Sequence, residues 1–304
     1  MIRMRTLLAA ALIGAAALHG LAQSYSSGQP VWPAFEGWEQ NEDGSANFVF
    51  GYMNDNWQEE LDVAVGPENS IEPGGPDCGQ PTHFQPRRNR FVFRVRVPKD
   101  WGNKEMTWTL ATHGVARQAF ASLRTDLQIE NIDIMSETGA LGAGSSNPEI
   151  RGDKPPVIKI VGSRSMTATV GKPLTLTAIV TDDGVPRPRG GSARARGRGA
   201  EDVEFRPPSR ITVGKNVGLH LSWFVYRGAA AAVTFEPRQI KTWEDTREGA
   251  NSPWAPRWIA PPMPPDGKCV ATVTFDQPGT YMLRARADDG ALTTDEDVTV
   301  SVSR

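Results

Sequence analysis

The stretch PGTYMLRARADDGALTTDEDVTVSV, Pro278 to Val302, decides the fold class of this chain. Apolar residues occupy every second position on both sides of an acidic turn, in the series Tyr281, Leu283, Ala285, Ala287 and Val298, Val300, Val302. A period of two is typical of strands with one buried and one exposed face. The turn signal Asp288-Asp289-Gly290 predicts an antiparallel hairpin whose connection continues through Asp297. We expect its polar face, with Arg284 and Arg286, to be turned to solvent.

The same alternation recurs along the chain. In the first half it occupies four runs, at residues 48–52, 61–65, 91–97 and 106–110. In the second half it occupies residues 174–180 and 219–225, followed by KCVATVTF and the hairpin. Short strands separated by Gly, Pro, Asn and Asp turns are typical of β-sandwiches. The sequence therefore predicts an all-β protein of two tandem β-sandwich domains, the second with long inserted loops.

Composition indicates where the domains begin and end. The run SETGALGAGSSNPEIRGDKPP is rich in Gly, Ser and Pro and has no periodicity, as is typical of a linker. Leu127 to Met135 is either a short helix or an extended segment that leads out of the first domain. The expected order is a signal peptide (1–22), an N-terminal domain (23–128), a linker (129–156) and a C-terminal domain (157–304) with insertions at 185–210 and 236–267.

The first residues predict export. Arg3 and Arg5 precede an apolar run from Leu7 to Leu21, and small residues fit the positions before a cleavage after Ala22. The alternative is an uncleaved anchor, but the run is shorter than the roughly 20 apolar residues of a spanning helix. The mature chain then has no stable membrane span. It keeps 31 basic against 35 acidic residues, a balance that gives no global signature of nucleic-acid binding.

Two motifs of the second half resemble the PKD and bacterial Ig-like domains of exported proteins. They are GKPLTLTAIVTDDG and FDQPGTYMLRARADDGALTTDEDVTVSV. Tyr281 is placed like the tyrosine-corner residue that starts strand F, and Trp223 like the core tryptophan of strand C. Leu283 stands where Ig domains carry their second cysteine, so the resemblance implies a core without a disulfide. The N-terminal half resembles secreted bacterial proteins that have no assigned activity.

The cysteines and histidines form no motif of a known catalytic centre. Cys269 lies on the apolar face of a strand and Cys78 in a turn-like loop, which disfavours a disulfide between them. His220 has the outward parity of its strand, which predicts an exposed side chain. His83 is more informative, because three reactive or charged residues lie near it in sequence, namely Asp77, Cys78 and Arg87. Whether the chain is an enzyme stays open, and the missing motifs favour a non-catalytic role.

The insertion at residues 236–267 predicts a binding surface. It is far longer than the usual connection of about four to six residues, and its prolines favour a fixed conformation. Trp243, Trp254 and Trp258 supply the aromatic area that dominates binding hot spots. One interpretation is that Trp254 or Trp258, with Arg257 beside them, anchors a partner or a sugar. The other is that the rings cover a sheet edge or pack on the N-terminal domain.

Arginines form two further clusters. Arg94 and Arg96 share one strand face and predict a site for an anionic glycan or a lipid head group. The alternative is a charged face that blocks edge pairing or pairs with the acidic N-terminal strands. The second cluster, VPRPRGGSARARGRG, has nothing apolar to bury and indicates a disordered loop. Neither cluster indicates nucleic acid as a partner.

Two acidic pairs predict a cation site. In an Ig-like topology the loops after strands B and F lie at one pole of the sandwich. These loops begin with Asp182, Asp183 and with Asp288, Asp289. Clustered carboxylate oxygens suit Ca²⁺. The alternatives are that Asp-Asp-Gly only makes good turns and that the arginine-rich insertion neutralises the charge.

Taken together, these patterns favour an exported, non-catalytic binding or adhesion module of the bacterial envelope, with a protein or glycan partner. Its expected location is the periplasm, the cell surface or the extracellular space. Two alternatives stay open. One is an enzyme or an enzyme accessory acting on envelope polysaccharide, and the other is a structural spacer. No cofactor other than Ca²⁺ is indicated.

Overall fold

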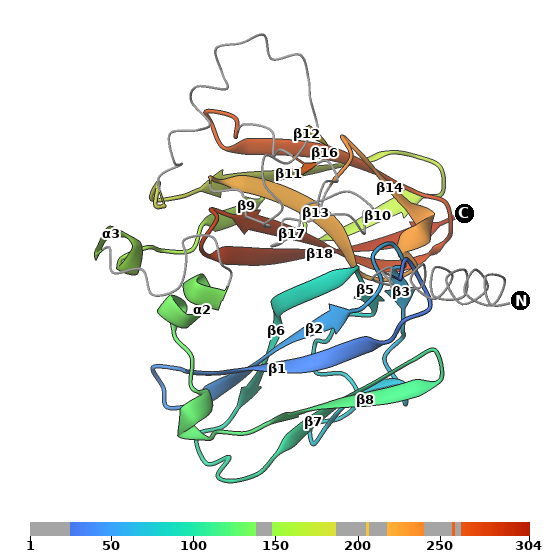
Figure 1. Ribbon diagram of the computed structural model, residues 1–304. Helices are drawn as coiled ribbons and strands as arrows, with labels where there is room; N and C mark the ends of the chain where they lie inside the picture. The colour runs from blue at the N-terminus through green and yellow to red at the C-terminus, as the bar shows by residue number, and fades with distance from the viewer. Residues whose placement is uncertain (1–24, 138–147, 187–204, 207–217, 240–256, 259–262) are drawn as a thin grey trace, which may run out of the picture.

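The computed structural model describes residues 25–137, 148–186, 205–206, 218–239, 257–258 and 263–304. The first part of the chain forms a sandwich of two antiparallel sheets, ordered β1-β2-β6 and β4-β7-β8, beside a small β3-β5 pair (Figure 1). Its strands are β1 (Val31–Gln40), β2 (Ala46–Asn54), β3 (Leu61–Asp62), β4 (Asn69–Glu72), β5 (His83–Phe84), β6 (Arg87–Val97), β7 (Met106–Thr112) and β8 (Val115–Ala121). The prediction of an all-β sandwich fold is confirmed.

The second part forms a sandwich with the strand arrangement of an Ig domain. Its sheets are ordered β9-β11-β16-β14 and β10-β18-β17-β13, which correspond to the ABED and GFC sheets. Strand β10 runs parallel to β18, as a split first strand does when it crosses to the other sheet. The strands are β9 (Val157–Ile160), β10 (Ser165–Thr169), β11 (Leu174–Thr181), β13 (His220–Arg227), β14 (Val233–Glu236), β16 (Lys268–Phe275), β17 (Gly279–Asp288) and β18 (Thr293–Ser303).

Short helices join these layers. Residues 127–135 were expected to form either a short helix or an extended segment. They overlap the end of the 3-10 helix η1 (Thr125–Leu127) and most of the α-helix α2 (Asn131–Glu137). The other helices among the described residues are α3 (Pro148–Arg151) and η2 (Ala230–Ala232). The two long insertions meet, because β12 (Phe205–Arg206) pairs with β15 (Arg257–Trp258). None of the described helices is both long and apolar enough to span a bilayer.

The core of the C-terminal sandwich has the predicted Ig features. Trp223 and Leu283 are buried in one apolar cluster with the alternating residues of β17 and β18. The Tyr281 hydroxyl donates a 3.0 Å hydrogen bond to the backbone oxygen of Gln277, four residues upstream, as in a tyrosine corner. Its ring packs on Phe275 with centroids 4.8 Å apart. Gly228 leaves room for this ring, since a Cβ there would lie 2.7 Å from it.

Replacing Tyr281 with phenylalanine is expected to lower the free energy of unfolding by about 1 kcal/mol, because the hydrogen bond to Gln277 is lost while the ring packing remains. Urea denaturation of the purified variant measures this as a lower midpoint with an unchanged slope. Tyr25→Phe, at an exposed tyrosine, is the matched control and should leave the midpoint in place. Equal midpoints for both variants would show that the corner contributes nothing.

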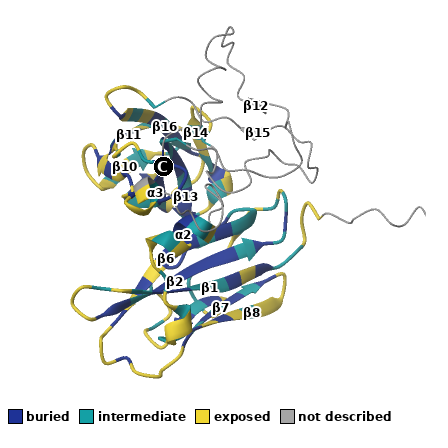
Figure 2. Cartoon of the chain, turned by 60° about the vertical axis from the view of Figure 1, so that its left-hand side comes forward, coloured by how far each residue is buried: buried dark blue, intermediate teal, exposed yellow. Residues whose placement is uncertain are grey.

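Two predictions about the terminal hairpin were wrong. Residues 293–297 belong to β18, so the connection between the strands is residues 289–292 only. The polar face is not turned to solvent, because Arg284 and Arg286 are buried. Strand pairing sets Arg284 opposite Asp297 and Arg286 opposite Asp295, so the face neutralises its own charge. This face of the C-terminal sheet packs against the N-terminal domain, since Phe224, Tyr226 and Met282 contact the N-terminal core. Figure 2 shows buried residues along β13 of the C-terminal sandwich and along β2 of the N-terminal sandwich.

Candidate functional site

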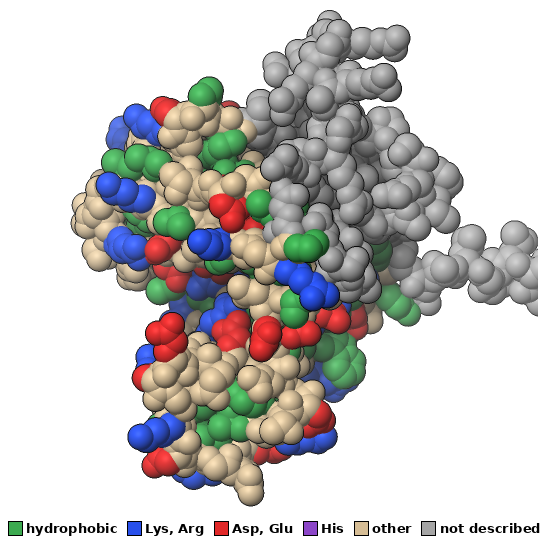
Figure 3. Space-filling view, turned by 90° about the vertical axis from the view of Figure 1, so that its left-hand side faces the viewer, with side chains coloured by type: hydrophobic (Ala, Val, Ile, Leu, Met, Phe, Trp, Pro, Cys, Tyr) green, Lys and Arg blue, Asp and Glu red, His purple; other side chains and the backbone are tan. Residues whose placement is uncertain are grey.

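The interface between the domains is built on a buried arginine. Only 7% of Arg284 is exposed, and its guanidinium donates to both Asp297 oxygens at 2.8 and 2.9 Å. A third hydrogen bond of 2.7 Å reaches the backbone oxygen of Val92 in β6, across the interface. The guanidinium also lies 3.5 Å from the centre of the Tyr226 ring. Figure 3 shows acidic and basic side chains gathered where the two domains meet.

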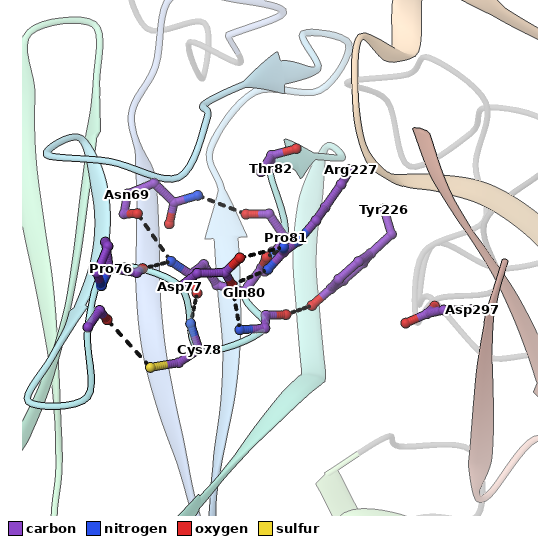
Figure 4. A network of polar contacts seen from close by, with 12 residues as sticks. Asn69, Pro76, Asp77, Cys78, Gln80, Pro81, Thr82, Tyr226, Arg227 and Asp297 are labelled. Carbon is purple, nitrogen blue, oxygen red and sulfur yellow. Dashed lines mark hydrogen bonds and ion pairs between the residues drawn. The ribbon is translucent and has the colours of Figure 1, made fainter. Parts of the chain in front are cut away.

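A second set of contacts clamps β13 onto the loop before β5 (Figure 4). The Tyr226 hydroxyl donates to the Gly79 oxygen at 2.6 Å, and its ring belongs to the N-terminal core. Arg227 donates to the backbone oxygen of Gln80 at 2.9 Å and to both carboxylate oxygens of Asp77 at 2.8 and 3.0 Å. The backbone amide of Thr82 donates to the backbone oxygen of Tyr226 at 3.1 Å. These contacts fix the C-terminal sheet on the N-terminal domain at several points.

A third apolar cluster ties the linker region to both domains. Ile134 and Met135 of helix α2 are buried with Val49 and Phe91 of the N-terminal sheet. Ala291 and Leu292, from the turn between β17 and β18, complete the same cluster. The start of the expected linker is therefore a helix with a buried face. The same apolar cluster holds the turn between β17 and β18 in place.

The structure does not assemble a nucleophilic centre around His83. The buried ring lies 2.8 Å through Nδ1 from Asp62 and 3.1 Å through Nε2 from Glu60, so both nitrogens are engaged. Cys78 instead contacts the Gly75 oxygen at 3.6 Å, and burial raises the pKa of its thiol. Asp77 pairs with Arg227. Both cysteines are free. A thiol activated by this histidine is not part of the described structure.

His220 corrects a second sequence expectation. The side chain is buried, and Nδ1 donates to the Gly218 oxygen at 2.7 Å. The outward parity of β13 is correct, but this face is not open to solvent, and Phe224 and Tyr226 of β13 pack against the N-terminal core. Parity predicted the face and could not predict what covers it.

His83 should make stability depend on pH. Burial alone would lower its pKa, but the hydrogen bonds that the ring donates to Asp62 and Glu60 raise the pKa from 6.5 to about 9. Stabilisation by the imidazolium is therefore complete below pH 6.5 and is lost as the pH rises through 9. We expect the wild type to lose on the order of 3 kcal/mol over this range. His83→Gln, which cannot titrate, should lose much less. Urea denaturation of the wild type and of His83→Gln, below pH 6.5 and above pH 9, measures both losses. Equal losses in the two proteins would contradict the assignment.

The acidic loops meet at one pole of the C-terminal sandwich, as the Ig-like topology predicted. A pocket of about 320 Å³ is lined by Asp182 after β11 and by Asp289 after β17. Its apolar lining includes Val180, Leu219 and Met263. The arrangement combines apolar walls with convergent carboxyl groups, which is typical of a site for a small ligand or for one side chain of a partner.

Asp153, two residues after α3, is a member of this group that the sequence reading missed. Burial, followed by the nearby charges of Asp183 and Asp182, raises its pKa to about 7. Burial is also the main cause that raises the pKa of Asp289 to about 7 and that raises the pKa of Asp182. No periodicity surrounds Asp153, so the sequence offered no signal that the linker carries a carboxyl group to the pole.

The other predicted site residues do not join this pocket in the described structure. Arg94 forms a two-pronged ion pair with Glu39 at 2.7 and 2.8 Å, and Arg96 pairs with Asp43. The alternative interpretation, that these arginines pair with acidic N-terminal strands, is therefore the one observed. Trp243 and Trp254 lie outside the described residues. Of Arg257 and Trp258 only the backbone is described, in β15.

Comparisons with known proteins identify no family. No family model matches, and no curated protein matches. Among solved structures, domains 4 and 5 of the S-layer protein SbsC align over 66% of each chain, with 9% identity and a TM-score of 0.24. The eight N-terminal Ig domains of DSCAM isoform 1.30.30 align over 90% of this chain and 27% of that one, with 10% identity and a TM-score of 0.23. A chimeric titin Z1Z2 carrying a decorin peptide covers 90% and 97%, with 11% identity and a TM-score of 0.24. Likeness at this level carries no argument about function.

Proposed function

We propose that this chain is an exported, non-catalytic binding module of the bacterial envelope, and that the pole pocket takes its protein or glycan partner. The observation that carries the proposal is the convergence of Asp182 and Asp289, from loops far apart in sequence, in one pocket with apolar walls. In antibody variable domains the loops at one end of the sandwich form the binding site. Apolar walls with a few convergent polar groups are common features of ligand sites.

The domain interface supports the same proposal. Buried ion pairs and the clamp of β13 hold the N-terminal domain in a fixed relation to the pocket. Because the two domains already have one fixed arrangement, binding of a partner does not cost the entropy of ordering them. The occupied nitrogens of His83 and the raised pKa of Cys78 argue against the rival enzyme, because neither group is poised to react.

A pair of matched variants tests the proposal. Leu219→Arg places a bulky charge in the pocket lining, whereas Val270→Arg places the same charge on the exposed outer face of β16. Each purified mature protein is immobilised, and retention of components from a bacterial envelope extract is compared with retention by the wild type. We expect the Leu219 variant to lose a component that the Val270 variant keeps, at similar melting temperatures. Identical retention by all three proteins would contradict the pocket as the binding site. Release of sugars from envelope polysaccharide would support the enzyme instead.

A further inference from the structure

We propose that Trp32, Asp55 and Arg117 form a second binding surface, on the N-terminal domain, that takes a pyranose ring of a glycan chain. The surface goes beyond the proposed function, because the pole pocket belongs to the other domain. Trp32 lies at the start of β1, Arg117 near the start of β8, and Asp55 directly after β2. Strands β1 and β8 are edge strands of the two N-terminal sheets and lie side by side (Figure 1).

The first argument is that the ring of Trp32 is held in place and is still open to solvent. Its Nε1 donates to Asp55 Oδ2 at 2.7 Å, and the Arg117 guanidinium lies over the ring, 4.3 Å from its centre. Even so, 42% of Trp32 is exposed. Tryptophan is highly buried on average, so this exposure needs an explanation. A ring that is already held in place loses little conformational freedom when a ligand stacks on it.

Closure of the seam between β1 and β8 is the alternative explanation, since sheet edges are often covered by side chains. Trp38 shows what such closure looks like further along β1. Only 7% of Trp38 is exposed, its Nε1 donates to the backbone oxygen of Arg124 at 2.7 Å, and its backbone oxygen accepts the amide of Ile129 at 2.9 Å. Seam closure therefore accounts for Trp38 and leaves the exposure of Trp32 unexplained.

The second argument is that the polar groups beside the ring match the rim of a sugar. Within the described part of the chain, Asp55 Oδ1 has no hydrogen-bond partner, and Arg117 donates only through Nη1, to the backbone oxygen of Ala116 at 3.2 Å. The surface thus offers an acceptor and a donor next to an apolar ring. A pyranose has the complementary pattern, which is an apolar face of C–H groups bordered by hydroxyl groups.

The same pattern favours a sugar over a protein side chain as the occupant. A tryptophan that anchors a protein partner lies in a fully desolvated pocket, surrounded by contacts that exclude water. Trp32 instead lies on an exposed strand, bordered by the carboxylate of Asp55 and the guanidinium of Arg117. Both charged groups would have to be desolvated by an apolar partner, whereas hydroxyl groups replace their water with hydrogen bonds.

The third argument is that a second aromatic ring continues the surface beyond Asp55. The backbone oxygen of Asp55 accepts a 2.8 Å hydrogen bond from Arg87, whose guanidinium lies over the Trp57 ring, 4.4 Å from its centre. The loop that carries Asp55 and Trp57 is fixed by Asn54 and Asn56, which are fully buried and joined by a 2.9 Å hydrogen bond between their side chains. Two aromatic rings on a fixed scaffold suit a chain of sugars better than a single one.

An array of bacterial polysaccharides, probed with the purified protein, tests the proposal. We expect the wild type to bind, and we expect Trp32→Ala and Arg117→Ala each to weaken binding about tenfold or more. Trp32→Phe should keep more binding than Trp32→Ala, because it keeps an aromatic face. Phe120→Ala is the matched control and should bind like the wild type. Phe120 is 52% exposed on β8, and none of the ring or cation contacts of the described residues involves it.

Three results would overturn the proposal. They are an array without wild-type binding, full binding by Trp32→Ala, and an equal loss in Phe120→Ala. If Trp32→Ala lost only a protein component of the envelope extract, the surface would be a protein interface and the assignment to a glycan would be wrong. Melting temperatures show whether each variant is folded.

This proposal and the proposed function fail separately. Leu219→Arg should keep the array binding of the wild type, because Leu219 lines the pole pocket and not this surface. Loss of the same polysaccharides by Leu219→Arg would place glycan binding in the pocket and overturn the second surface.

Discussion

Replacing Arg284 with alanine is expected to lower the free energy of unfolding by about 3–5 kcal/mol. The substitution leaves Asp297 and the Val92 oxygen, which the guanidinium joins, without their shared donor at a buried interface. It also removes the cation above the Tyr226 ring. Equilibrium urea denaturation of the purified variant measures the loss.

Arg94→Ala is the matched control for this prediction. Arg94 makes the same two-pronged contact with a carboxylate on another strand, but 43% of its side chain is exposed. A surface pair of this kind contributes about 0–1 kcal/mol. The difference between the two variants therefore measures what the buried setting of Arg284 adds, including its contacts with Val92 and the Tyr226 ring. Similar losses would mean that the domain interface does not exclude water around Arg284.

Replacing Tyr226 with alanine is expected to lower the free energy of unfolding by a similar amount. The destabilised domain should be the N-terminal one, although Tyr226 itself lies in the C-terminal sandwich. The residue lies on β13, yet its ring is buried in the N-terminal core beside the loop of Gly79. Truncating a buried aromatic ring costs about 3–5 kcal/mol, because the cavity only partly collapses. Hydrogen exchange should show lost protection in β5 and β6 as well as in β13.

Tyr226→Phe separates the ring from its hydroxyl group. It keeps the packing and removes only the 2.6 Å hydrogen bond to Gly79, so we expect a loss of about 1 kcal/mol. If the alanine variant changed exchange in the C-terminal domain alone, the two cores would be independent, and the account of a shared interface would be wrong.

Many strands of both domains were predictable because each has a face buried in its own sandwich, but the sequence analysis predicted none of β1, β4, β8 and β14. The apolar alternation around Phe48, Phe93 and Trp108 predicted the N-terminal core, and Trp223 with Leu283 predicted the C-terminal one. The tyrosine corner was predictable for a different reason. Its hydrogen bond joins Tyr281 to the backbone of Gln277, four residues upstream, so the residues that make it stand together in sequence.

The domain interface was not predictable from the same patterns. A period of two says that one face is polar, and it does not say whether water or another domain covers that face. Here the polar face alternates Arg284 and Arg286 on one strand with Asp295 and Asp297 on the next. Opposite charges in register neutralise the face, which lowers the cost of burying it. Such a cross-strand match is the signal that the sequence contained.

The acidic pole was half predictable. Ig-like topology alone was enough to bring the loops of Asp182 and Asp289 together. Asp153 could not be predicted, because a linker has no periodic pattern that fixes its path. The aromatic anchor proposed at Trp254 or Trp258 remains a prediction, because Trp254 lies outside the described residues and only the backbone of Trp258 is described.

Differential scanning calorimetry of the purified protein tests most directly whether the two sandwiches form one unit. The buried pairs of Arg284 and the placement of Tyr226 in the N-terminal core predict one cooperative transition, with equal calorimetric and van't Hoff enthalpies. Arg284→Ala should lower the temperature of that transition or split it. Two separate transitions in the wild type, with a calorimetric enthalpy well above the van't Hoff enthalpy, would contradict the account.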